Sequence, residues 1–198
     1  MDLSRKSALV VGAGGLGGPA LLVLAGAGVG RIVVVEDDAV ELARAADVVL
    51  DGSDNFATKF LANDAALRAR RPLVHGGVLR TTAQLLTVVP GGLGGCLRCL
   101  FEGPPPAGSV PSCADAGVLG PVAGLAGALM GAEALRVLAG ERGAYEGRLL
   151  VFEARTARSR LVLVRKRAGC AACAGTQPLE GTAPIACEQT SSRPGGVA

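Results

Sequence analysis

The sequence predicts an α/β fold built on a doubly wound, mostly parallel sheet, and three observations support this prediction. Short apolar runs rich in Val, Leu and Ala recur along the first half of the chain. Segments of helical length separate several of these runs, and strands that alternate with helices are typical of parallel sheets covered on both faces. A glycine-rich turn also follows the first apolar run and precedes a helix, as in folds that bind ligands at the carboxyl ends of their strands.

Each predicted strand is a short apolar run that ends at, or just before, a glycine, a proline or an acidic residue. These runs are residues 8–12, 31–36, 46–51, 72–76 and 84–89. Residues 16–27 and 55–70 are predicted helices, and the second has apolar side chains available for packing. Because aromatic residues make up only 3% of the chain, its core must consist mainly of Val, Leu and Ala.

The composition changes after Pro90. Residues 91–111 are rich in Gly and Pro and predict an irregular loop. Residues 117–139 predict a long helix of small residues, which would be either buried or at a subunit interface. A hairpin-like pair of strands is predicted over residues 148–153 and 160–164.

The length of 198 residues fits one domain of ordinary size. Beyond Gly175 the chain is largely Gly, Pro, Ser and Thr with little apolar content, which predicts a disordered tail. We therefore expect a folded domain over residues 1–174 and a flexible tail over residues 175–198.

Net charge and hydropathy exclude several classes of protein. A formal net charge of +3 is too small to indicate a nucleic-acid partner. The chain opens with an acid and leads directly into an apolar strand, which is not the pattern of a signal peptide. Residues 7–30 and 116–132 carry no charge, but the first stretch contains a glycine-rich turn and the second is short for a membrane span. We expect a cytoplasmic protein that does not insert into membranes.

Four of the six cysteines form two pairs, Cys96-x-x-Cys99 and Cys170-x-x-Cys173. Paired thiolates at this spacing can complete a tetrahedral zinc site, and the absence of a secretory segment argues against disulfide bonds. Because the two pairs lie 70 residues apart, a metal there would join two distant elements of the fold. Cys187, in the predicted tail, has no assigned role.

The glycine-rich turn contains Gly12, Gly14, Gly15 and Gly17. Such glycines let the backbone approach a phosphate, which then binds the free N–H groups at the start of the following helix. Glu36 ends the next predicted strand, where an acid usually binds a ribose hydroxyl. The pattern predicts a site for a dinucleotide or ATP, and the alternative is a turn without a ligand.

A second group of polar residues, Asp51-Gly-Ser-Asp54-Asn55, ends the third predicted strand. Asp54 could bind Mg²⁺ together with phosphate oxygens. Alternatively, Asp54 or Ser53 could cap the following helix, and one residue could do both. Lys59, one helical turn later, could reach a phosphate or be solvated.

Three further features allow more than one interpretation. Cys113 lies outside both cysteine pairs and could be a nucleophile if a helix N-terminus lowers its pKa, or a small buried apolar residue. His75, the only histidine, lies in an apolar strand, where a structural role is favoured over catalysis. The basic residues between 155 and 167 form either a solvated face or a surface that attracts an acidic protein.

The order of these motifs resembles the ThiF/MoeB family of sulfur-carrier adenylyltransferases, which are relatives of the ubiquitin-activating enzymes. The matching segments are residues 11–17, 51–55, 63–65, 96–99, 112–120 and 170–173. The resemblance implies a Rossmann-like fold. It also implies that the protein uses MgATP to adenylate the C-terminal Gly-Gly carboxylate of a small ubiquitin-like sulfur carrier, with release of pyrophosphate.

The resemblance also implies roles for individual residues. The glycine-rich turn would hold ATP, with Glu36 on the ribose, where the family more often has Asp. Asp54 would carry Mg²⁺, with Asn55 beside it. Cys113 matches the position at which some members form a persulfide or thioester. The four paired cysteines match structural zinc ligands, and the family resemblance implies a homodimer.

One part of the family pattern is missing. Only nine residues separate Glu36 from Ala46, whereas the family has here a longer segment with cations that contact the ATP phosphates. We expect one strand and at least one helix to be absent. Lys6, Lys59 or Arg80 could replace the missing cations. The alternative to an active adenylyltransferase is therefore a degenerate, non-catalytic scaffold that binds nucleotide or carrier. A nicotinamide-dependent oxidoreductase would leave the paired cysteines unexplained.

Overall fold

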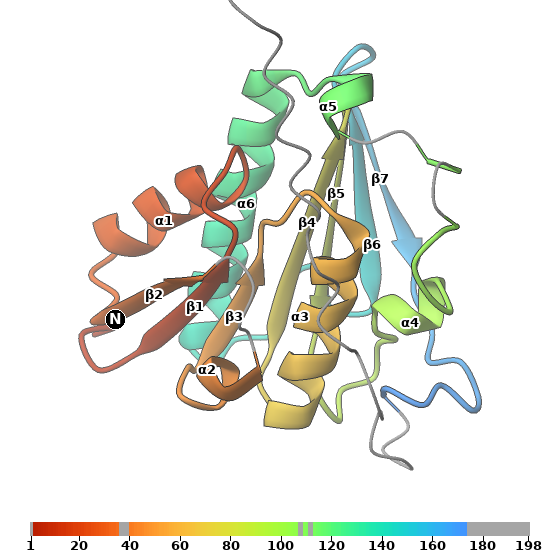
Figure 1. Ribbon diagram of the computed structural model, residues 1–198. Helices are drawn as coiled ribbons and strands as arrows, with labels where there is room; N and C mark the ends of the chain where they lie inside the picture. The colour runs from red at the N-terminus through yellow and green to blue at the C-terminus, as the bar shows by residue number, and fades with distance from the viewer. Residues whose placement is uncertain (1, 36–39, 107–108, 111–112, 174–198) are drawn as a thin grey trace, which may run out of the picture.

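The computed structural model describes residues 2–35, 40–106, 109–110 and 113–173 (Figure 1). The strands are β1 (Ser7–Val11), β2 (Arg31–Val35), β3 (Val48–Asp51), β4 (Leu73–Leu79), β5 (Thr82–Val88), β6 (Arg148–Glu153) and β7 (Arg158–Leu163). The helices are α1 (Gly17–Gly26), α2 (Val40–Arg44), α3 (Phe56–Ala69), α4 (Leu97–Leu100), α5 (Cys113–Ala116) and α6 (Gly120–Leu138).

The strands form one 7-stranded sheet in the order β2-β1-β3-β4-β5-β6-β7. The first four strands in this order are parallel to one another. β5, β6 and β7 are then added by antiparallel pairing, so that β6 runs in the same direction as the first four strands. The prediction of a mostly parallel α/β sheet is confirmed in this sense, and the predicted hairpin is the β6–β7 edge of the sheet.

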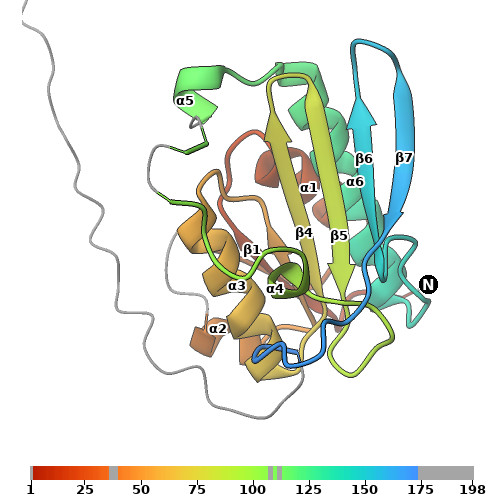
Figure 2. The same ribbon diagram turned by 90° about the vertical axis from the view of Figure 1, so that its right-hand side faces the viewer.

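Helices cover both faces of the sheet, as Figures 1 and 2 show. α1 and α6 pack together on one face, whereas α2 and α3 pack on the other. Because successive side chains of a strand point to opposite faces, β1 contributes to both cores. Val10 belongs to the core beneath α1 and α6, whereas Leu9 and Val11 belong to the core beneath α3.

The long predicted helix is α6, which lies along β4 and β5 and against α1 (Figure 1). Glycines allow this close packing. A Cβ on Gly127 would lie 2.2 Å from the carbonyl oxygen of Leu16, and a Cβ on Gly131 would lie 2.7 Å from Val23 Cβ. Within the described part of the chain, α6 is long and apolar enough to cross a membrane by length and composition, but here half of its apolar window is buried in the fold. The prediction of a helix that is buried or at a subunit interface is confirmed for the face that packs on α1 and the sheet.

The connection from β2 to β3 is short, as the sequence predicted. It passes from the edge strand β2 across β1 to β3 and contains the five-residue helix α2. Glu36 and the predicted tail, residues 175–198, lie outside the described residues. The predicted loop over residues 91–111 is wrong in one respect, because the four-residue helix α4 forms between Cys96 and Phe101.

Candidate functional site

The turn between β1 and α1 is built almost entirely of backbone atoms. Gly12 has a φ of +79°, which few residues other than glycine adopt. A Cβ on Gly17 would lie 1.9 Å from the carbonyl oxygen of Gly12, and a Cβ on Gly52 would lie 2.8 Å from the amide nitrogen of Gly17. At Gly14 there is no atom within 4 Å of such a Cβ. The turn is therefore packed on its inner side and open at Gly14.

Two helix N-termini meet at this turn. α1 begins after Leu16 and α6 begins after Leu119, and neither helix has a side-chain cap. A Cβ on Gly15 would lie 3.3 Å from the Cβ of Ala123, which brings the first turn of α6 beside the glycine turn. Pro19 and Pro121 have no N–H, and the amides of Gly18 and Val122 donate to the carbonyl oxygens of Gly14 and Leu119. The positive ends of the two helix dipoles, more than free N–H groups, therefore favour an anion at this position.

The loop after β3 carries Asp54 and Asn55 to the same carboxyl edge of the sheet. Asn55 is the N-cap of α3, and its Oδ1 accepts a hydrogen bond of 2.8 Å from the amide of Thr58. Capping by Asp54 or Ser53, the alternative considered from the sequence, is therefore wrong. Asp54 is exposed to solvent at the start of the helix.

A group of buried polar side chains lies beneath this loop. Asp51, at the end of β3, has no exposed side-chain surface. Its Oδ2 lies 3.3 Å from Lys59 Nζ and 2.6 Å from His75 Nδ1. Its Oδ1 accepts hydrogen bonds of 2.5 and 3.1 Å from the hydroxyl and amide of Ser53. Lys59 also donates a hydrogen bond of 2.6 Å to the carbonyl oxygen of Gly76. We call these side chains the Asp51 cluster.

The Asp51 cluster holds one ion pair and a neutral imidazole. Burial opposes ionisation of Asp51, but the Lys59 ammonium and the hydrogen bonds from His75 and Ser53 outweigh it and hold the pKa of Asp51 well below its usual range. Burial also lowers the pKa of His75, although its hydrogen bond to Asp51 acts in the opposite direction. Since an ionised carboxylate only accepts, His75 Nδ1 carries a proton and donates it to Asp51.

This arrangement changes the interpretation of two residues. Lys59 is neither solvated nor directed at an open phosphate site, because its ammonium is buried against Asp51 and Gly76. His75 takes the structural role that the sequence favoured. Together they join the end of β3 to α3 and β4, and so fix the loop that carries Asp54.

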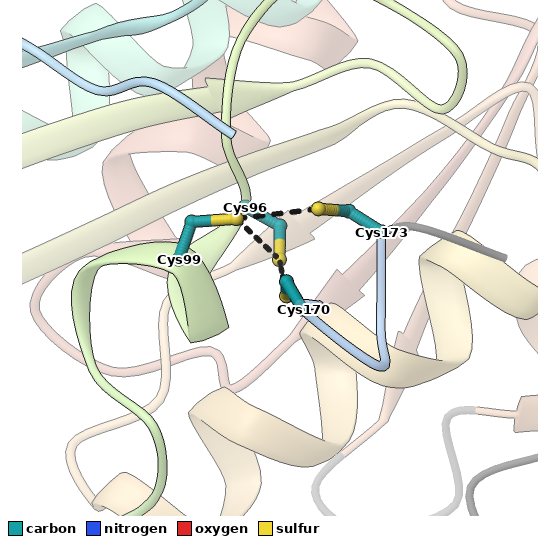
Figure 3. Close-up of side chains that lie close together, drawn as sticks. All are labelled: Cys96, Cys99, Cys170 and Cys173. Carbon is teal, nitrogen blue, oxygen red and sulfur yellow. Dashed lines mark hydrogen bonds between the residues drawn. The ribbon is translucent and has the colours of Figure 1, made fainter. Parts of the chain in front are cut away.

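The four paired cysteines meet beside the middle of α3, and Figure 3 shows their side chains converging from two segments of the chain. Their sulfur atoms all lie within 4.8 Å of one another, and all four cysteines are free. The Cys96–Cys170 and Cys96–Cys99 distances are 3.8 and 3.9 Å, whereas Cys99–Cys173 is 3.2 Å. Sulfur atoms bound to zinc at about 2.3 Å in a tetrahedron are about 3.8 Å apart, so this donor set fits zinc.

The pKa shifts of the thiols are also consistent with a site for a metal ion. Burial and the neighbouring thiols raise the pKa of Cys96, and burial and hydrogen bonds raise the pKa of Cys173 to about 12. The pKa of Cys170 is lowered to about 7, because hydrogen bonds from the backbone of Cys173 and Ala172 outweigh the effect of burial. Without a cation these thiols resist becoming thiolates together, and a bound divalent metal would remove that resistance.

The first cysteine pair is fastened to α3 by polar contacts. The Oδ1 of Asn63 accepts a hydrogen bond of 3.1 Å from the amide of Leu97. Arg98 makes a bidentate ion pair with Asp64, at 2.8 Å from Nε to Oδ1 and 2.6 Å from Nη2 to Oδ2. The same guanidinium lies 5.0 Å from the centre of the Phe60 ring. Residues in the middle of α3 therefore hold the cysteine loop in place.

Cys113 begins the short helix α5, which contacts β4 and lies above the carboxyl end of β4 and the start of β5 in Figure 1. Its backbone is therefore on the same edge of the sheet as the glycine turn. The side chain of Cys113, like all of Glu36, lies outside the described part of the structure. Their predicted roles remain predictions.

The comparison with protein families decides which family this fold and site represent. The model of the ThiF family matches residues 1–44 and 38–172. The chain belongs to the ThiF family. The two matched pieces meet at residues 38–44, beside the short connection between β2 and β3, so this is where the chain departs from its family.

Curated relatives agree with this assignment. A sulfur carrier protein adenylyltransferase of Thermus thermophilus is 37% identical over 232 aligned positions, which cover 90% of this chain and 85% of that protein. The adenylyltransferase and sulfurtransferase MOCS3 of Aedes aegypti is 36% identical and is covered to 52%, so the chain spans about half its length. Since 90% of 198 residues is about 178, about 54 positions of the first alignment have no counterpart here.

Solved structures show the same fold. The crystal structure of E. coli MccB has a TM-score of 0.72 at 17% identity, covering 90% of this chain and 67% of that chain. The structure of MccB with ATP has a TM-score of 0.69 at 17% identity, covering 87% of this chain and 68% of that chain. The Rossmann-like α/β architecture is therefore shared despite low identity.

Proposed function

We propose that this protein adenylates the C-terminal glycine of a ubiquitin-like sulfur-carrier protein at the expense of MgATP. The observation that carries the proposal is the 37% identity over 90% of the chain to a sulfur carrier protein adenylyltransferase. The glycine turn with two uncapped helix N-termini supports it, because it offers a site for phosphate groups at the carboxyl edge of the sheet.

In this reaction a carboxylate oxygen of the carrier forms a bond to the α-phosphorus of ATP. The bond from that phosphorus to the bridging oxygen breaks, and pyrophosphate leaves with the electron pair. The chain's part is to hold the reactants in line and to stabilise the charge on the phosphates. The backbone of Gly12–Gly17 would hold the phosphates, and Glu36 would bind the ribose.

The carboxylate of Asp54 would hold Mg²⁺, which neutralises phosphate charge when bound. The Asn55 side chain is committed to capping α3 and would act by fixing the position of Asp54. Lys59 would support the same loop from below through Asp51, so we assign it a positioning role. In a later step the thiolate of Cys113 would attack the acyl-adenylate and release AMP to form a thioester, or would take the outer sulfur of a persulfide donor, whose thiolate leaves.

The four cysteines would bind one zinc ion with a structural role. Zinc would fasten the loop around α4 to the segment after β7, two regions far apart in the chain. Both regions pack at the border of the apolar core beneath α3, to which Cys96, Val164 and Cys170 belong, and the metal would add a direct link between them. A cytoplasmic homodimer remains our expectation for the assembly.

The proposal is tested by exchange of labelled pyrophosphate into ATP, with and without a small ubiquitin-like protein that ends in Gly-Gly. We expect exchange that depends on the carrier and on Mg²⁺, and that is lost in Asp54→Asn. A carrier shortened by its last two glycines is the matched control. Exchange that is absent with every Gly-Gly carrier tried would contradict the enzymatic function.

One observation favours a second function, a non-catalytic scaffold. About 54 positions of the alignment with the Thermus relative have no counterpart in this chain, and the connection from β2 to β3, where the sequence resemblance places phosphate-contacting cations, is short. Carrier binding without pyrophosphate exchange, measured by calorimetry on the same samples, would support the scaffold.

A further inference from the structure

A site for ATP phosphates needs positive charge, which makes the cations at the carboxyl edge of the sheet informative. Among the described residues, the cations near the carboxyl ends of β1, β3, β4 and β6 are Lys59, Arg80, Arg155 and Arg158. Lys59 is buried and paired with Asp51. Arg155 and Arg158 lie on the β6–β7 turn, which is two strands beyond β4 in the sheet. Arg80 is the exposed cation nearest the glycine turn by strand order.

The backbone of Arg80 is held firmly beside the start of α6. Arg80 lies between β4 and β5 in the left-handed region, with a φ of +55°. Its amide donates a hydrogen bond of 2.9 Å to the carbonyl oxygen of Gly117, and its carbonyl oxygen accepts one of 2.9 Å from the amide of Leu119. Leu119 is the N-cap of α6, the helix whose first turn touches the glycine turn.

The geometry of α6 and β4 places Arg80 level with the glycine turn. Met130 lies against Gly76, since a Cβ on Gly76 would be 2.2 Å from its sulfur. Ala123, beside Gly15, is seven residues nearer the start of α6, or about 10 Å at 1.5 Å per residue. Arg80 is four residues beyond Gly76 along β4, or about 13 Å at 3.3 Å per residue. Arg80 and Ala123 therefore lie at similar heights above the contact between Gly76 and Met130.

The distance across the sheet from β4 to β1 also allows a side chain on β4 to reach the glycine turn. β4 is separated from β1 by β3 alone, and strands in a sheet lie about 4.8 Å apart, so about 10 Å separates the end of β4 from the line of β1. A chain of phosphates on the glycine turn would lie between these two strands, within reach of a long side chain from β4.

We propose that Arg80 binds the phosphate groups of the nucleotide from the β4 side, opposite the glycine turn. This inference rests on the proposed function, since it assumes that the glycine turn binds ATP. Arg80 would supply a charge-assisted hydrogen bond to a phosphate oxygen, while the glycine turn and the start of α1 approach the phosphates from the β1 side.

The test compares Arg80→Asn with Arg70→Asn. Arg70 is a close match, because it is also exposed and has a φ of +56°, but it ends α3 at the opposite edge of the sheet. Asn tolerates this backbone conformation, so both variants should fold and unfold at similar temperatures. Calorimetry would measure the Kd for MgATP and for adenosine, which lacks phosphates, at two salt concentrations.

For Arg80→Asn we expect the Kd for MgATP to rise tenfold or more with a weaker dependence on salt, while the Kd for adenosine stays unchanged. Arg70→Asn should stay within twofold of the unchanged protein, and Arg80→Lys should recover part of the affinity. An unchanged Kd for MgATP in Arg80→Asn would overturn this inference alone. Absence of MgATP binding by the unchanged protein would overturn the proposed function and this inference together.

Discussion

At its N-terminal end α3 packs on the Asp51 cluster, whereas from its middle onward it packs on the four cysteines. In the Asp51 cluster, the negative charge of Asp51 meets the ammonium of Lys59, a neutral His75 and the hydroxyl of Ser53. Within the described residues, no buried side-chain nitrogen or oxygen lacks a hydrogen-bond partner. This cluster is therefore complete with the protein's own groups.

The cysteine cluster is different, because it consists of four thiols, which can become thiolates of the same negative charge. The raised pKa values of Cys96 and Cys173 reflect burial and the proximity of like groups. Contacts from Asn63 and Asp64 hold the loop but contribute no cation to the sulfur atoms. The comparison contrasts one buried polar group that is complete with the protein's own side chains and another whose four sulfur atoms could hold a metal ion.

The largest expected effect is that of removing the metal. Cys96→Ser should reduce bound zinc from about one per chain to none, measured by elemental analysis. Loss of a structural metal should cost more than about 5 kcal/mol, because metal binding is coupled to folding. For a domain of this size that corresponds to a Tm lower by at least about 10 °C. Cys187→Ser is the matched control and should keep its zinc; an equal loss there would contradict the assignment.

Breaking the Asp51 cluster should have the next largest effect. Asp51→Asn leaves the Lys59 ammonium buried without a negative partner, which should cost about 3–5 kcal/mol in the free energy of unfolding. Denaturant unfolding measures this cost. In the double variant with Lys59→Met, the loss should be clearly smaller than the sum of the two single losses. Additive losses would show that the two side chains act independently.

A smaller effect is expected where the cysteine loop meets α3. Asp64→Asn weakens the bidentate pair with Arg98, of which Asp64 is 6% and Arg98 19% exposed. We expect a loss of about 1.5–3 kcal/mol in the free energy of unfolding. Glu141→Gln, which removes the exposed pair with Arg136, should cost no more than about 1 kcal/mol. Equal effects of the two substitutions would mean that the loop does not depend on this contact.

The smallest effect is a dependence of stability on pH. The pKa of His75 is lower in the folded protein than its ordinary value of about 6.5, mainly because of burial. Below pH of about 6.5 the unfolded chain therefore binds more protons, and stability falls as the pH decreases toward the folded pKa, by at most about 1.4 kcal/mol per pH unit.

His75→Gln should reduce this slope, since His75 is the only histidine in the chain. Urea unfolding of the zinc-loaded protein between pH 7.5 and 5.5, with the metal content checked at each pH, would measure it. An unchanged slope in His75→Gln would show that another group is responsible.

Local sequence patterns predicted the elements with strong periodicity or special spacing. The apolar strands, α1, α3 and α6 were predicted close to their observed bounds, and the spacing of the cysteine pairs predicted their convergence. α2, α4 and α5 were not predicted, because helices of four or five residues are too short to show a helical period.

The Asp51 cluster was missed because it depends on register between strands. Asp51 pairs with His75 across β3 and β4, 24 residues apart in the chain, and Lys59 comes from the helix between them. A signal was available, since an acid ends one apolar strand while a lone histidine stands in the next. Only the pairing of the strands shows that these residues meet.

The close approach of the turns after β1 and β3 has a consequence for how this chain can vary. A methyl group on Gly17 would lie 1.9 Å from the oxygen of Gly12, and one on Gly52 would lie 2.8 Å from the nitrogen of Gly17. About 54 positions of the alignment with the Thermus relative are absent from this chain. Where the two turns meet, by contrast, Gly17 and Gly52 leave no space for a side chain, so any larger residue would require the backbone to move.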